Sequence, residues 1–184
     1  SSDLWDMHRD AEISSADFLE IALNGLAGES DDAIVNIVLS QLTTSVEAYS
    51  KEANRNAYRE KLAAGLWTLT QNSAAGSDLQ LLISRAFALN AQTEEQTANI
   101  RELLNGAAAG LKVDADLRWT FVTALAERGL MDKAALSVEL LKDNTLTGQL
   151  AHATCLAALP TAEAKAETWN RAQFVHKPKT ADHG

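Results

Sequence analysis

The sequence of 184 residues has one cysteine, two prolines and no long apolar run. The single cysteine, Cys155, excludes an internal disulfide framework and fits a reducing compartment. No run of about 18 apolar residues is present, so no transmembrane helix is predicted. The N-terminus, SSDLWDMHRD, has neither the basic start nor the apolar stretch of a secretion signal. We therefore expect a soluble, cytoplasmic protein.

Basic residues are also scarce. Sixteen Lys and Arg residues stand against 25 Asp and Glu residues, which gives a formal net charge of -9 and a pI near 4.9. Nucleic acid attracts a concentrated basic surface, so this balance argues against a nucleic-acid partner and, for the same reason, against a membrane surface. With 46% hydrophobic residues, the chain suffices for one domain with a core or a short array of stacked helices.

Helix is the element that the pattern predicts nearly everywhere, because no useful stretch shows the alternation of a strand. Ser14 and Asp17 have the S-x-x-D spacing of a capping box, and Asp31 and Asp32 precede the run AIVNIVLSQLTTSVEAY. Gly129 is a C-terminal stop signal. Further helices are expected over residues 54–71, 79–91, 94–105, about 115–128, 131–141, 146–159 and 161–172.

The apolar positions indicate which helix faces are buried. We expect stripes of Phe18, Ile21, Ala22 and Leu26 in one helix, and of Ile34, Val38, Leu42, Val46 and Tyr49 in the next. The segment LQLLISRAFALNA is apolar around most of its circumference. In the stretch GLKVDADLRWTFVTALAERG, one arc contains Leu117, Phe121, Ala124 and Leu125, and a second contains Trp119, Val122 and Ala126.

Helices that bury two faces are typical of stacked repeats rather than of a compact four-helix bundle. About ten helices joined by short turns predict antiparallel pairs. Because no tetratricopeptide or ankyrin signature is present, the predicted fold class is all-α, an irregular HEAT-like superhelix. Residues 1–172 are expected to form a single helical domain and residues 173–184 a polar tail. Leu4, Trp5 and Met7 resemble the last turn of a helix, so the chain, which starts at Ser1, is interpreted as a fragment of a larger protein.

Catalytic and metal-binding patterns are missing from the sequence. There is no H-E-x-x-H pattern, no G-x-S-x-G elbow and no phosphate loop, since GAAAG at residues 106–110 lacks the G-K-[ST] ending. His152 and Cys155 are three residues apart on one predicted helix, but two ligands without a third make a poor metal site. We predict no catalytic residue and no metal ligand in this chain, and helix packing for this pair.

Three charged residues are the candidates for binding a substrate. Arg85 lies among apolar residues of its predicted helix, so its guanidinium must reach solvent or an acid, and Asp116 is one candidate partner. If Arg85 lines a concave surface, it becomes the best candidate for holding a peptide carboxylate. Asp114 and Arg118 are spaced i to i+4, which a structural helix pair explains fully. The alternative is a ligand-facing role for Arg118 or Asp116.

Four stretches resemble the C-terminal helical domain of aminopeptidase N enzymes, the zinc-dependent gluzincin aminopeptidases, and in particular the actinobacterial type. They are LWDMHRDAEISSADFLEIALNGLAGESDD, GSDLQLLISRAFA, GLKVDADLRWTFVTALAERG and PTAEAKAETWNRA, in that order from residue 4 to about 172. The resemblance implies a HEAT-like superhelix that encloses a substrate chamber over the catalytic domain and controls access to it. It also implies a parent that uses zinc to remove N-terminal residues from peptides.

The family's H-E-x-x-H and G-A-M-E-N motifs do not occur here, so no catalytic or zinc-binding role is carried over to any residue. The fragment alone is predicted to be inactive and to need no cofactor. Its expected partners are the catalytic domain of the same parent chain and a peptide substrate. The alternative is a free-standing helical-repeat module that binds a protein segment on its concave face.

Overall fold

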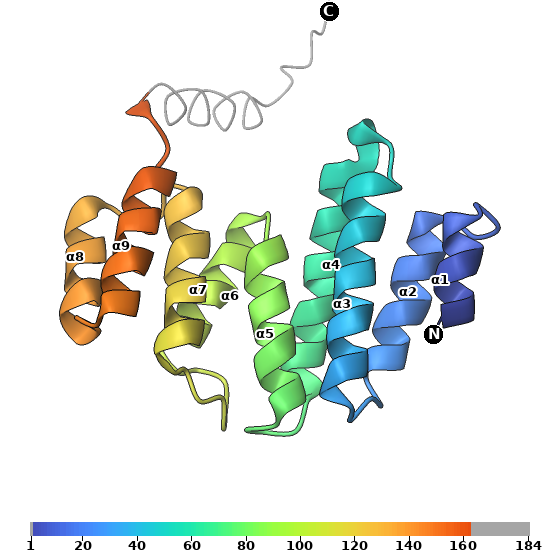
Figure 1. Cartoon of the computed structure of the whole chain (residues 1–184), viewed down its shortest axis with the longest axis horizontal. Helices are drawn as coiled ribbons and strands as arrows, with labels where there is room; N and C mark the ends of the chain where they lie inside the picture. Colours follow the sequence, from blue (N-terminus) through green and yellow to red (C-terminus); the bar gives the residue numbers. More distant parts are fainter. Residues whose placement is uncertain (1, 163–184) are drawn as a thin grey trace, which may run out of the picture. The chain divides into compact units, whose positions relative to one another are not determined.

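A computed structural model describes residues 2–162, and within them it contains nine α-helices and no strand (Figure 1). The helices are α1 (Ser2–Arg9), α2 (Ser15–Leu26), α3 (Asp32–Ala48), α4 (Glu52–Asn72), α5 (Asp78–Asn90), α6 (Glu94–Leu104), α7 (Ala115–Glu127), α8 (Lys133–Lys142) and α9 (Leu146–Ala158). The chain divides into two compact units, one up to Phe121 and one from Val122. The predicted all-α class of stacked helix pairs is confirmed.

Side-chain caps explain where several of these helices begin. The Ser14 hydroxyl accepts a hydrogen bond from the Asp17 amide, and the Asp31 carboxylate accepts from the amides of Ala33 and Ile34. Such bonds satisfy N–H groups that have no partner inside a helix. At the other end of α7, Gly129 has a φ of 70°, a conformation that glycine adopts without steric cost. The starts predicted at Ser14 and Asp31 and the Gly129 stop are confirmed, whereas the helices predicted from residues 54 and 131 begin at Glu52 and Lys133.

The core of the first unit is formed mainly by α2, α3, α4 and α5. Phe18, Leu42, Leu66 and Phe87, one from each of these helices, are fully buried. The helix α1 joins this core through His8, whose ring stacks on Phe18 with 4.7 Å between ring centroids. The imidazole Nε2 of His8 lies 2.8 Å from the hydroxyl oxygen of Ser45. His8 is therefore a core histidine of this unit.

Two predicted apolar stripes are partly wrong. Ile21 of α2 is 49% exposed and Leu19 is buried instead, while on α3 Ile34 is 37% exposed and Val35 is buried. Tyr49, expected on the α3 stripe, is also exposed. The reason is that α2 and α3 meet their neighbours at a slightly different rotation, so the buried arc shifts toward the adjacent residue. As a consequence, Ile21 and Ile34, which the helical periodicity predicts to be buried, form part of an exposed apolar surface.

Both predicted arcs of α7 are buried. Leu117, Phe121, Ala124 and Leu125 of the first arc, and Trp119, Val122 and Ala126 of the second, are at most 6% exposed. The interpretation of α7 as a helix covered on two sides is therefore confirmed.

The second unit contains the end of α7 together with α8 and α9. Its only cysteine, Cys155, is fully buried, and its sulfur lies 3.1 Å from the Thr123 hydroxyl oxygen. Burial raises the pKa of the Cys155 thiol above its usual value.

None of the helices in residues 2–162 is long and apolar enough to cross a membrane. The helix predicted over residues 161–172 and the tail 173–184 lie almost wholly outside the described residues, so the single domain over residues 1–172 stays a prediction.

Candidate functional site: a polar groove between two helices

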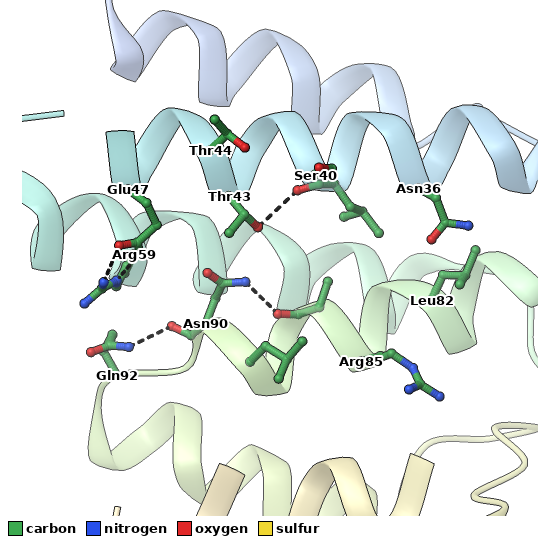
Figure 2. Close-up of a pocket in the computed structure, with 13 residues that line it drawn as sticks. Asn36, Ser40, Thr43, Thr44, Glu47, Arg59, Leu82, Arg85, Asn90 and Gln92 are labelled. Carbon is green, nitrogen blue, oxygen red and sulfur yellow. Dashed lines mark hydrogen bonds and ion pairs between the residues drawn. The ribbon is translucent and has the colours of Figure 1, made fainter. Parts of the chain in front are cut away.

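A groove with a volume of about 720 Å³ runs between α3 and α5 in the first unit. Figure 2 shows its polar residues on α3, its second wall on α5, and the ion pair of Glu47 and Arg59 at one end. The residues that line it are Asn36, Leu39, Ser40, Thr43, Thr44, Glu47, Arg59, Leu82, Arg85, Ala86, Leu89, Asn90 and Gln92. This groove contains one of the three predicted substrate-binding residues, Arg85.

The wall formed by α3 is a row of polar side chains. Asn36, Ser40, Thr43 and Glu47 follow one another at intervals of three or four residues, so they share one face of the helix. This face is separate from the buried stripe that contains Val35, Val38, Leu42 and Val46. A face of this polarity, set beside the apolar Leu82 and Leu89 of α5, suits a ligand with both polar and apolar parts.

The groove contains hydrogen-bond acceptors beside the donors of Arg59 and Arg85. The side-chain amide nitrogen of Asn36 donates to the Asp32 carbonyl at 2.8 Å, and that of Asn90 donates to the Ala86 carbonyl at 2.9 Å. The Thr43 hydroxyl donates to the Leu39 carbonyl at 3.1 Å. One N–H of each amide and the Thr43 hydroxyl proton are therefore used within their own helices, and the side-chain oxygens of Asn36 and Thr43 are left to accept, whereas Asn90 is buried. Backbone N–H groups of a peptide are suitable donors for them.

The Glu47–Arg59 pair has a two-bond geometry. The Arg59 Nε and Nη2 atoms donate to the two carboxylate oxygens of Glu47, each at 2.6 Å. These hydrogen bonds lower the pKa of Glu47 and raise the pKa of Arg59. Both groups therefore remain charged at neutral pH. The pair links α3 to α4 and defines one end of the groove.

Arg85 forms the ion pair that the sequence predicts. Its Nη2 donates to Asp116 Oδ2 of α7, and its Nη1 lies 3.4 Å from the Thr120 hydroxyl. In Figure 2 the guanidinium points away from the α3 wall. The Asp116 side chain remains 72% exposed, so the pair is accessible to solvent. A guanidinium has five N–H donors, and these two contacts leave others for a ligand.

Arg118 is not part of this arrangement. Its Nη1 lies 3.5 Å from the Leu104 carbonyl of α6, on a different side of α7 from Asp116. Asp114 caps α7 by accepting a hydrogen bond from the Leu117 amide at 2.8 Å. The structure thus brings Arg85 and Asp116 together and places Arg118 elsewhere.

The polar row of α3 and its ion pair are absent from the sequence-based candidates. Their signal is present in the sequence, since Asn36, Ser40, Thr43 and Glu47 are polar residues at helical spacing. A row of this kind reads as an ordinary solvated face. Only the packing of α5 beside it turns that face into a groove wall.

Metal-ligating residues do not gather in the described chain. Within residues 2–162, no group of three or more His, Cys, Asp or Glu residues could hold a metal ion. Cys155 is in contact with Thr123 instead. These residues therefore do not fit a zinc site.

The fold and the groove define an all-α domain of stacked helix pairs with an open polar surface. A family model described as the ERAP1-like C-terminal domain matches residues 1–183, so the chain belongs to this family. An Aminopeptidase N from Streptomyces lividans is 38% identical over 167 residues, which are 90% of this chain and 20% of the relative. The chain thus spans about a fifth of the length of this relative. It is a C-terminal domain of the kind found in aminopeptidase N-like proteins, as the resemblance predicts.

Proposed function

We propose that this chain is the non-catalytic C-terminal domain of an aminopeptidase that removes N-terminal residues from peptides, and that it encloses the substrate chamber and controls access to it. The observation that carries the proposal is the family match over residues 1–183, together with the 38% identity to an Aminopeptidase N. The partners are the catalytic domain of the same parent chain and the peptide. Zinc belongs to that catalytic domain in this proposal, and the cytoplasmic location stays a prediction.

The groove between α3 and α5 is the surface that we propose for peptide contact. Its acceptors on Asn36 and Thr43 match the N–H donors of an extended peptide, and the apolar Leu82 and Leu89 can pack on its side chains. Arg85 would bind the carboxylate at the peptide end remote from the cleaved bond, with Asp116 holding the guanidinium in place. The role of Arg118 as a substrate ligand stays a prediction.

The test of this groove is Arg85→Gln in the full-length parent chain. We expect KM for peptides to rise roughly tenfold, as for the loss of one charge-assisted hydrogen bond, while kcat stays similar. The KM of an aminoacyl anilide should not change, because so small a substrate contacts only the catalytic domain. Steady-state kinetics with both substrates measures the split.

The control variant is Lys133→Gln, which removes an exposed positive charge on α8 in the other unit. It should leave both KM values unchanged. Arg85→Lys keeps the charge but loses the paired N–H geometry, so an intermediate KM is expected. Equal changes for both substrates, or none for either, would contradict the role of Arg85 in peptide contact.

A further inference from the structure

A second groove, between α2 and α3 in the first unit, has a different character from the polar one. It has a volume of about 270 Å³, and its lining is mostly apolar. The residues that line it are Leu4, Phe18, Ile21, Ala22, Gly25, Leu26, Glu29, Ile34, Val38 and Gln41. Ile21 and Ile34, the two isoleucines that the sequence places in the core, are exposed here. We name this surface the α2–α3 groove.

The two grooves lie on opposite sides of α3. On one side the helix presents Ser40 and Thr43, and on the other it presents Ile34 and Val38. An apolar surface left open to water is costly, and such patches usually mark an interaction site. A permanent interface is more apolar than a surface that stays open to solvent. This contrast assigns the α2–α3 groove to a permanent contact.

Gly25 gives independent support. It lies in the last turn of α2 and lines the groove, and a Cβ atom added there would meet nothing within 4 Å. Its φ is not positive, so neither the backbone nor the packing of this unit requires glycine. Glycine inside a helix is destabilising relative to alanine, but it permits close approach of another backbone. The missing side chain therefore points to an element that packs directly on α2.

The charge around the α2–α3 groove indicates which charged residues the packing element should contain. Residues 10–50 contain no Lys or Arg, and their acidic residues are Asp10, Glu12, Asp17, Glu20, Glu29, Asp31, Asp32 and Glu47. Glu29 is the charged residue among those that line the groove, and Asp17 lies one turn before Ile21 on the same face of α2. The surroundings of the groove therefore carry net negative charge. Complementary charge requires Lys or Arg residues on the partner.

We propose that the α2–α3 groove is the docking site for an amphipathic helix, apolar on one face and flanked by Lys or Arg, supplied by the rest of the parent chain. A groove between two antiparallel helices accepts the ridge of a third helix. The inference rests on the proposed function, under which the chain is one part of a larger protein. The Aminopeptidase N relative is about five times as long as the segment that matches this chain. A parent of similar length would contain ample chain to supply the helix.

The experiment compares two cysteine variants of the full-length chain, Gly25→Cys in the α2–α3 groove and Ser40→Cys in the polar groove. Gly25 and Ser40 are both exposed in the described chain, and Cys155 is buried. Each variant is treated with a maleimide, and labelling at position 25 or 40 is followed by peptide mass. We expect Gly25→Cys to react at least about tenfold more slowly than Ser40→Cys under native conditions, and equally fast in urea.

Charge reversal provides the second variant. Glu29→Lys, combined with Gly25→Cys, should raise the labelling rate at position 25 several-fold, because it opposes the basic flanks of the docked helix. Equal native rates for Gly25→Cys and Ser40→Cys would overturn the proposal. Protection that disappears on dilution, with a dimer in solution, would overturn it as well, because the occupant would then be a second copy.

The two proposals can fail separately, since labelling does not depend on activity. An active aminopeptidase with fast labelling at position 25 would retain the proposed function and overturn the docking site. A chain with slow labelling at position 25 but no aminopeptidase activity would retain the docking site and overturn the proposed function.

Discussion

The Glu47–Arg59 pair shows how one residue contact links helices and ends the polar groove. Its hydrogen bonds lower the pKa of Glu47 from the ordinary value of 4.5, despite some opposing desolvation. A carboxylate with a lowered pKa stabilises the fold above its unfolded pKa, and this contribution is lost as the pH falls through the folded pKa. Because both side chains are about a third exposed or more, the contribution is that of a good surface pair.

We therefore predict that Glu47→Gln lowers the free energy of unfolding by roughly 0.5 to 1 kcal/mol at neutral pH. The difference from wild type should shrink as the pH falls from neutral toward about 3, and it disappears only below the lowered pKa of Glu47 in the folded chain. Urea unfolding at both pH values measures it. Glu60→Gln, which removes an exposed acid elsewhere on α4, is the control and should have little effect. A deficit that persists at low pH would show that the ion pair is not its cause.

At the scale of the element, several helix starts and stops could be predicted from the sequence because they depend on local chemistry. A cap such as Ser14 or Asp31 needs only the amides of its own first turn. The buried arcs of α7 were equally readable, since almost every apolar residue of that helix is covered. The family resemblance is confirmed as well, because it depends on the order of four sequence stretches.

The grooves were not readable, because they depend on which helices meet and at what rotation. Ile34 and Val35 are adjacent and similarly apolar, so the sequence alone does not determine which one faces the core. For the same reason the polar row at Ser40 and Thr43 read as solvated surface. The Arg85–Asp116 pair was predicted because a charged residue among apolar neighbours must find a partner, whatever the rotation of its helix.

Tight packing at a helix start gives a prediction for α9. A Cβ atom at Gly148 would lie within 1.9 Å of the Asp143 carbonyl oxygen, so Gly148→Ala must displace the turn before the helix. We expect it to lower the free energy of unfolding by about 1 to 3 kcal/mol. Gly25→Ala has open space around the new atom. In the 184-residue segment alone, it should instead raise the free energy of unfolding by about 0.5 to 1 kcal/mol. Thermal or urea unfolding measures both, and equal effects would contradict this packing account.

At the scale of the whole molecule, the two faces of α3 would have different binding roles in the first unit. The apolar α2–α3 groove would be covered by the parent chain, and the polar groove would remain open to a peptide. Under the proposed function, this division would let an acidic set of helices shape and limit the space in which a catalytic domain acts. Long-range attraction by the acidic surface would also favour positively charged peptide N-termini.

The most direct measurement is the aminopeptidase activity of the full-length chain that carries this segment, with and without a zinc chelator, beside the segment alone. We predict activity in the full-length chain, its loss with the chelator and its recovery on adding zinc. The 184-residue segment should be inactive under every condition. A full-length chain without aminopeptidase activity, or a segment that cleaves peptides by itself, would contradict the central claim.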